Sequence, residues 1–161
     1  NNDTRYTFLQ ACKDAGHTET ECGRYFAGNY YNWTAAVALS DSSDYATDDY
    51  DLDQSICPAG WMLPKSGSKT GSGSFAYLKD QAGLTAGVNG SIHQYPNFFV
   101  YGGLWYGTSY GIGIGGLYWS SSSQTNYYAY SLIFEADEGA ALYSNTTNER
   151  GSGQSVRCVV R

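Results

Sequence analysis

The chain has 161 residues, enough for one domain with a buried core, and 42% of them are hydrophobic. Its net charge is −6 and its nine basic residues are scattered, so it lacks a stripe that could neutralise phosphates, and nucleic acid is an unsuitable partner. No apolar run approaches the roughly 20 residues that span a membrane. A charged content of only 15% beside sixteen tyrosines is typical of a secreted β-rich protein or a binding surface.

The first half of the chain predicts little regular structure. Residues 4–15 fit a short helix that ends at Gly16. The aromatic stretch 23–39 fits a strand that turns into a helical or irregular segment. Residues 40–53 contain six acidic side chains and are interpreted as a solvated loop.

Calcium is the alternative interpretation of this acidic loop. Asp49, Asp51 and Asp53 alternate along it, and hard cations prefer oxygen ligands. The glycine and the final glutamate of an EF-hand loop are both missing. We therefore expect no metal and no other cofactor, and keep calcium as a candidate at these three aspartates.

The second half predicts more regular elements. Residues 74–83 fit a helix with a serine cap and a glycine stop. Seven of the fifteen residues in 102–116 are glycine, which predicts loops and irregular strands. Residues 127–134 predict a strand, 140–144 a segment that pairs back on it after a turn, and 154–160 the closing strand.

Four cysteines, Cys12, Cys22, Cys57 and Cys158, form no C-x-x-C pair, so zinc is poorly supported. Their even number favours two disulfides and an oxidising compartment. Three pairings are possible. We favour Cys12 with Cys22 as a local link and Cys57 with Cys158, which closes a loop of roughly 100 residues worth nearly 5 kcal/mol in the loop-entropy model. The end of the chain would then lie beside the turn at 61–64.

Two motifs that suggest chemistry are rejected. Residues 111–116, GIGIGG, match a dinucleotide-binding pattern, but the segment that follows does not predict the helix that must hold the pyrophosphate. His17 and His93 are the only histidines, and neither belongs to a nucleophile motif. The serine run 120–123 lacks a nucleophile elbow, and the acidic pair at 137–138 lies in an expected turn. We therefore expect no enzyme.

The aromatic residues are the most informative candidates. Trp61 and Trp119 are expected to be buried anchors. The tyrosines are too numerous for all of their hydroxyls to be satisfied inside a core. Tyr, Ser, Gly and Asn together are the composition of recognition loops, and Trp105, Tyr106 and Tyr110 on the glycine-rich segment are expected to be exposed for a ligand. Glycosylation sequons occur at Asn2, Asn32, Asn89 and Asn145.

Three segments in this order, CPAGWMLP (57–64), YWSSS (118–122) and GQSVRCVVR (153–161), resemble the Fibrobacter succinogenes major paralogous domain. GNYYNWTAA (28–36) is similar to the stretch that precedes the first motif in that family. The resemblance covers roughly residues 28–161. It leaves 1–27 as an N-terminal extension with its own disulfide.

The resemblance implies an α+β domain of the C-type lectin-like fold, with a mixed, mostly antiparallel sheet, one or two short helices and a long irregular loop region rich in Gly and Tyr. It also implies the Cys57–Cys158 disulfide and a surface-exposed domain that binds a ligand. Variable receptors of diversity-generating retroelements share this fold and concentrate recognition near the C-terminal strands, which would include 121–131 here. The ligand-binding residues expected in this chain are Trp105, Tyr106, Tyr110, Asn126, Tyr127, Tyr128, Tyr143 and Asn145.

The chain departs from the calcium-dependent sugar-binding lectins of this fold. It has Tyr95-Pro96-Asn97 in place of Glu-Pro-Asn, and Ser120 follows Trp119 in place of Trp-Asn-Asp. We therefore expect an extracellular bacterial surface adhesion module that recognises a glycan or a protein on another cell without calcium. The alternative is a structural subunit that self-assembles into an extracellular filament or surface layer. The chain starts at Asn1 with no signal peptide, so a processed form or an excerpt is expected.

Overall fold

The computed structural model describes residues 10, 12–18, 21–22, 29–39, 50–51, 53–81, 99–135 and 142–161. Within them the chain is a mixed α+β protein with mostly antiparallel strands, short helices and two disulfides. None of its described helices is long and apolar enough to cross a membrane.

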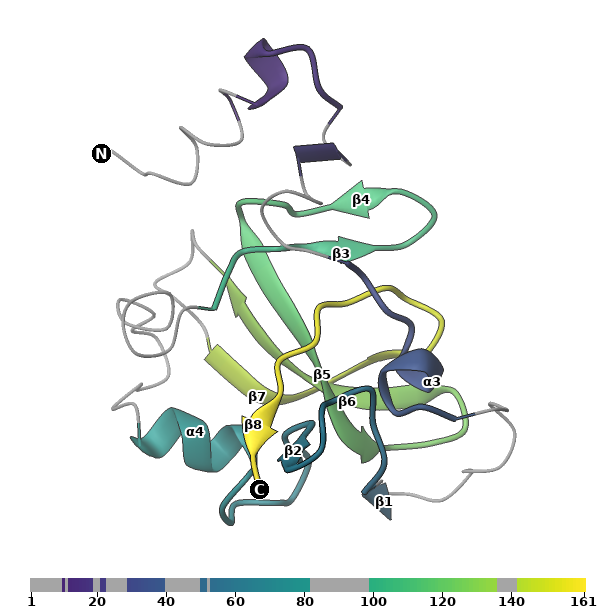
Figure 1. The fold of residues 1–161 in the computed structure, drawn as a ribbon, viewed down its shortest axis with the longest axis vertical. Coiled ribbons are helices and arrows are strands. Elements are labelled where there is room, and N and C mark those ends of the chain that lie inside the picture. Colours follow the sequence, from purple (N-terminus) through teal and green to yellow (C-terminus); the bar gives the residue numbers. More distant parts are fainter. Residues whose placement is uncertain are drawn as a thin grey trace.

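A four-stranded antiparallel sheet forms the centre of the molecule (Figure 1). Its strands lie in the order β1 (Tyr50–Asp51), β5 (Gly115–Ser123), β6 (Tyr128–Glu135) and β7 (Leu142–Glu149). All nine residues of β5 are buried, because this inner strand is covered on both faces.

Two buried clusters pack on the sheet. One gathers around Tyr118 and Phe134, and the other gathers around Trp119 and Trp33. Tyr118 and Trp119 are consecutive residues of β5, and successive side chains of a strand point to opposite faces. The two clusters therefore lie on opposite sides of the sheet, which explains why a strand with four serines and two glycines is buried throughout.

Two small antiparallel pairs complete the fold. Strand β2 (Trp61–Met62) pairs with β8 (Val159–Val160), and β3 (Leu104–Trp105) forms a hairpin with β4 (Ser109–Tyr110). In Figure 1 the β3–β4 hairpin lies between the N-terminal helical turn and the sheet, and the β2–β8 pair lies toward the opposite end of the molecule.

The two complete helices follow local signals in the sequence. Helix α4 (Phe75–Gln81) begins after Ser74, whose hydroxyl accepts the Tyr77 amide at 3.0 Å. Helix α3 (Trp33–Ala36) is a single turn whose cap, Asn32, accepts the Ala35 amide at 2.8 Å through its side-chain oxygen. The predicted helix at 74–83 is confirmed over α4. In the predicted helix 4–15, residues 10 and 12–14 are helical and the remaining residues lie outside the described ones, except Ala15, which is in a turn.

Both favoured disulfides are confirmed. Cys12 is bonded to Cys22, and Cys57 is bonded to Cys158 across 101 residues of sequence. The second bond lies beside the β2–β8 pair, where Trp61 is opposite Val160. The end of the chain therefore lies against the turn at 61–64, as the sequence predicted.

Three predictions need correction. Trp61 is not a buried anchor, because 44% of its surface is exposed, whereas Trp119 is fully buried. The closing strand is shorter than 154–160, because only Val159 and Val160 form β8 and the residues before them make isolated bridges. Asp51 lies in strand β1, where it pairs with Ser122, so the acidic stretch is not a loop throughout.

Two other predictions hold. The hairpin of β6 and β7 corresponds to the strands predicted at 127–134 and 140–144, although β7 continues to Glu149. Residues after GIGIGG form strand β5 rather than a helix, which agrees with the rejection of a dinucleotide site.

Candidate functional site

Tyrosines from two distant parts of the chain meet at one carboxylate. We call Tyr106, Tyr127, Tyr128 and Glu149 the Tyr–Glu cluster. The Tyr106 hydroxyl donates to Glu149 Oε2 at 3.0 Å, and the same carboxylate raises the pKa of the nearby Tyr127 phenol. The Tyr127 and Tyr128 rings meet edge to face, with centroids 4.9 Å apart. Because these three rings are 61%, 55% and 39% exposed, the cluster is open to a ligand.

The register of the β6–β7 hairpin places Glu149 in this cluster. Tyr128 at the start of β6 is directly opposite Glu149 at the end of β7. The turn before β6 is held by Thr125, whose hydroxyl accepts the amides of Tyr127 and Tyr128 at 3.1 and 3.0 Å. Both tyrosines therefore have a defined backbone at the β5–β6 turn, which lies at the open end of the β6–β7 hairpin.

The glycine-rich segment brings Tyr106 to the same place. Trp105 and Gly153 exchange two backbone hydrogen bonds of 2.8 Å, which tie the β3–β4 hairpin to the segment after β7. A Cβ at position 153 would lie 3.0 Å from the Trp105 Cβ, so the close approach favours glycine there. Tyr106 follows Trp105 and so lies within reach of Glu149.

Glu149 changes the acid–base properties of its neighbours. Its hydrogen bond and its negative charge raise the pKa of Tyr106 and of Tyr127 above the ordinary value of 10.0. The two phenols therefore stay neutral throughout the physiological pH range, and Tyr106 keeps donating to the carboxylate.

A pocket of about 330 Å³ adjoins the cluster. Its wall combines the cap of α3 with the ends of β6 and β7, and Asn32 lies in it because the Trp33 amide donates to the Arg150 carbonyl at 2.9 Å. Two carboxamides, two hydroxyl groups and one carboxylate can make polar contacts there, and the guanidinium of Arg150 packs on Trp33. The lining residues are Asn32, Thr34, Asn126, Tyr127, Glu149, Arg150 and Gly151.

Arg150 supports the floor of the pocket. Its side chain is buried at 5% exposure, and its guanidinium carbon lies 4.2 Å from the centroid of the Trp33 ring. Burial lowers the pKa of this guanidinium from its ordinary value. Its charge is directed at the aromatic ring beneath the pocket, whereas the Glu149 carboxylate is shared with the open cluster.

The structure gathers only some of the predicted ligand-binding residues. Tyr106, Asn126, Tyr127 and Tyr128 belong to the cluster or its pocket, and Trp105 is the next residue along the hairpin. The other three are exposed but lie elsewhere: Tyr110 opposite Leu104 on β4, Tyr143 opposite Ile133 on β7, and Asn145 farther along β7.

Sequence reasoning missed Glu149, Arg150, Asn32 and Thr34. The strand predicted at 140–144 did not identify Glu149, because the pairing of Glu149 with Tyr128 depends on a longer strand and on a register shift between Ser131 and Ile133. No local signal pointed to Asn32, because its place depends on backbone bonds between segments more than 100 residues apart.

The candidate calcium ligands do not form a described site. Asp49 lies outside the described residues, Asp51 is in β1, and Asp53 is exposed and accepts the Arg161 guanidinium through its carbonyl at 2.7 Å. Within the part of the chain that the structure describes, no three His, Cys, Asp or Glu side chains gather as metal ligands would.

The structure also describes some of the catalytic and glycosylation candidates that the sequence suggested. His17 is exposed, with its Nδ1 4.0 Å from Glu21 Oε2, and His93, Asp137 and Glu138 lie outside the described residues. Ser120–Ser123 are buried structural residues; for example, the Ser120 hydroxyl donates to the Tyr130 carbonyl at 2.7 Å. Of the sequons, Asn32 caps α3, Asn145 is exposed on β7, and Asn2 and Asn89 lie outside the described residues.

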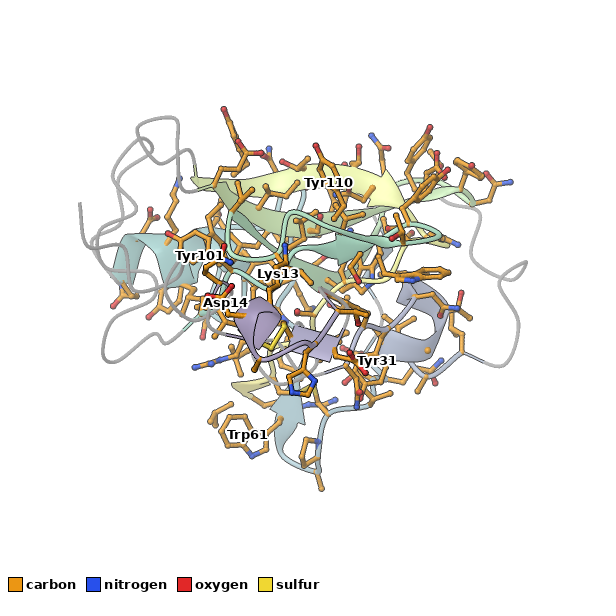
Figure 2. The ribbon with its side chains drawn as sticks, turned by 90° about the horizontal axis from the view of Figure 1, so that it is seen from above. Lys13, Asp14, Tyr31, Trp61, Tyr101 and Tyr110 are labelled. Carbon is orange, nitrogen blue, oxygen red and sulfur yellow. A yellow bond between two sulfur atoms is a disulfide. The ribbon has the colours of Figure 1, made fainter. Side chains whose placement is uncertain are left out.

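A second exposed apolar surface surrounds the β2–β8 pair. Ile56, Trp61 and Val160 are 41%, 44% and 66% exposed, and Trp61 is directly opposite Val160. Figure 2 shows Trp61 at the side of the molecule away from Tyr110. The exposed rings of Trp61 and Tyr110 therefore lie on different sides of the molecule.

No family model matches the chain, and neither the curated proteins nor the solved structures include a significant match.

Proposed function

We propose that this chain is a non-enzymatic, extracellular bacterial surface module of the C-type lectin-like type, related to the Fibrobacter succinogenes major paralogous domain, that binds a glycan or a protein without calcium. The convergence of the Tyr–Glu cluster with the adjoining pocket is the observation that carries this proposal. Exposed tyrosines give contact area at a low entropic cost, and amides and hydroxyls beside them give direction to hydrogen bonds. Two disulfides support an oxidising, extracellular location.

The residues around the Tyr–Glu cluster are held in place before a ligand arrives, which favours ligand binding. Glu149 is held by β-sheet pairing, Tyr127 by Thr125, and Asn32 by its capping bond. Such preorganisation reduces the free-energy cost of ordering the site when a ligand binds.

The test is a glycan array followed by calorimetric titration of the best ligand, with and without a calcium chelator. We expect Tyr127→Ala to weaken binding by about tenfold or more, as loss of a central aromatic contact does. Tyr77→Ala, which removes an exposed tyrosine from α4, is the matched control and should bind like the wild type. Unchanged binding in Tyr127→Ala, or loss of binding with the chelator, would contradict the proposal.

A second candidate function is a structural subunit of an extracellular filament or surface layer. The exposed surface of Ile56, Trp61 and Val160 favours it, because an apolar pair on an open two-stranded sheet is suited to contact another chain. Electron microscopy and sedimentation velocity distinguish the two functions. Polymers of the wild type that the Trp61→Ser variant no longer forms would support the filament. A wild type that is monomeric at every protein concentration would exclude it.

A further inference from the structure

Glu149 offers a ligand hydrogen-bond acceptors. A carboxylate has no proton, so Tyr106 is the donor in its bond with Glu149. A phenol has a single proton, and that of Tyr106 is used in this bond. Toward a ligand, the Tyr106 oxygen and the remaining carboxylate lone pairs can only accept, so a group that binds at Glu149 must donate hydrogen bonds.

The aromatic rings of the cluster favour a positively charged donor. The face of an aromatic ring is electronegative, and ammonium groups bind over such faces. Tyr127 and Tyr128 meet edge to face and remain exposed, so ring surface and carboxylate are accessible together. An ammonium group has donors and no acceptor, which matches both properties of the site.

The charges around the cluster also favour a positively charged ligand. Glu149 is the acidic residue among those that line the pocket, and the guanidinium of Arg150 is buried over the Trp33 ring. The whole chain carries a net charge of −6, which attracts cations over a longer range.

The rest of the pocket indicates what carries the ammonium group. Asn32 uses its side-chain oxygen to cap α3, so its amide nitrogen is available to donate. Asn126 and Thr34 add groups that both donate and accept. Together they suit sugar hydroxyls, and the volume of about 330 Å³ lies at the small end of the roughly 300–1,000 Å³ range of small-ligand pockets.

We propose that the Tyr–Glu cluster and its pocket bind an amino sugar with a free, protonated amine, with the ammonium group at Glu149 and the ring hydroxyls at Asn32 and Asn126. This inference rests on the proposed function and specifies the ligand class of the same site.

The test compares two ligands that differ in one group. A glucosamine trimer carries protonated amines near pH 6, and an N-acetylglucosamine trimer carries neutral amides at the same positions. We expect calorimetric titration to show binding of the glucosamine trimer about tenfold tighter or more, with a preference that falls as salt rises. Equal or tighter binding of the acetylated trimer would overturn the inference.

Two variants, each with a carboxamide in place of a carboxylate, identify the charge that binds the amine. Glu149→Gln should abolish the preference for the amine. Glu135→Gln removes the same charge from an exposed position at the far end of β6 and should keep the preference. A preference that survives Glu149→Gln would overturn the inference. Ultraviolet titration of the tyrosines confirms that the variant altered the intended contacts, because the pKa of Tyr106 and of Tyr127 should fall toward 10.0.

The outcomes also separate this inference from the proposed function. If the acetylated trimer binds and Tyr127→Ala weakens it, the binding module stands and the amino-sugar assignment fails. If a trilysine peptide binds as tightly as the glucosamine trimer, charge alone is recognised and the amino-sugar assignment fails. If no glycan on the array binds to the wild type, the amino-sugar assignment fails, and the proposed binding function is left with a protein ligand.

Discussion

Tyr118 shows how a tyrosine can be a core residue in a chain that exposes several of its other tyrosines. Its hydroxyl donates to the Val100 carbonyl at 3.0 Å and accepts the Val100 amide at 2.9 Å. The ring packs edge to face on Phe99 at 4.8 Å. Burial raises the pKa of Tyr118 to about 12, with the Val100 hydrogen bond acting in the opposite direction.

This raised pKa predicts a loss of stability in alkali. The folded-state pKa is above the unfolded value of 10.0, so the stabilisation is complete below pH 10 and is lost as the pH rises toward about 12. At about 1.4 kcal/mol for each pKa unit, roughly 3 kcal/mol depends on this group. Denaturant unfolding measured at several pH values should show the decline in the wild type.

Tyr118→Phe is the variant that isolates this effect. It should be less stable than the wild type near neutral pH by about 1–3 kcal/mol, because the Val100 amide and carbonyl lose their buried partner. Its stability should then decline less between pH 10 and 12. An equal decline in both proteins would show that other groups cause the alkaline unfolding.

The β3–β4 hairpin is the element that carries Tyr106 to Glu149, and its glycines determine whether it can form. Gly103 and Gly107 both have positive φ angles, of 68° and 71°. They differ in their surroundings. A Cβ on Gly103 would lie 2.8 Å from the Ile112 amide nitrogen, whereas a Cβ on Gly107 would meet nothing within 4 Å.

These two glycines make a matched pair of substitutions. Gly107→Ala should cost about 1–2 kcal/mol, because only the left-handed conformation is strained. Gly103→Ala should cost more, because the backbone of the hairpin must also move apart. Chemical denaturation measures both, and ligand titration should show weaker binding for Gly103→Ala, in which Tyr106 is displaced. Equal stability of the two variants would mean that the hairpin adapts without cost.

At the scale of the whole molecule, the last nine residues hold separate parts of the fold together. Gly153 bonds with Trp105 of the hairpin, Gln154 with Tyr31 before α3, and Ser155 bridges to Tyr118 in β5. The Cys57–Cys158 disulfide and the β2–β8 pair then attach the end of the chain to the turn at 61–64. The site depends on this segment, because Glu149 and Arg150 immediately precede it.

Removing the two disulfides should therefore have unequal effects. The loop-entropy model gives about 5 kcal/mol for the 101-residue separation of Cys57 and Cys158, and about 3 kcal/mol for the 10-residue separation of Cys12 and Cys22. The Cys57→Ala/Cys158→Ala variant should have the larger fall in unfolding free energy and lose hydrogen-exchange protection at Val159. The Cys12→Ala/Cys22→Ala variant is the control. A larger effect from the control would contradict this order.

Sequence reasoning succeeded where the signal was local. Ser74 and the apolar spacing after it predicted α4, because a cap and one helical face lie within a few residues. The alternation in 127–134 predicted β6, and the glycines of 102–116 predicted an irregular segment with exposed Trp105, Tyr106 and Tyr110. It failed at Trp61, where residue type suggested an anchor but pairing with the terminal Val160 leaves the ring on the surface.

By itself, the sequence predicted the capped helix and exposed tyrosines, because composition and short-range patterns carry these signals. It favoured the disulfide pairing that is observed among three possible ones, and the resemblance of its motifs implied the α+β class. Only the tertiary structure decided which tyrosines act together. Glu149 meets Tyr106 through the Trp105–Gly153 bridge, and Asn32 reaches the pocket through the Trp33–Arg150 bond. Such contacts depend on backbone pairing between distant segments, which sequence spacing does not encode.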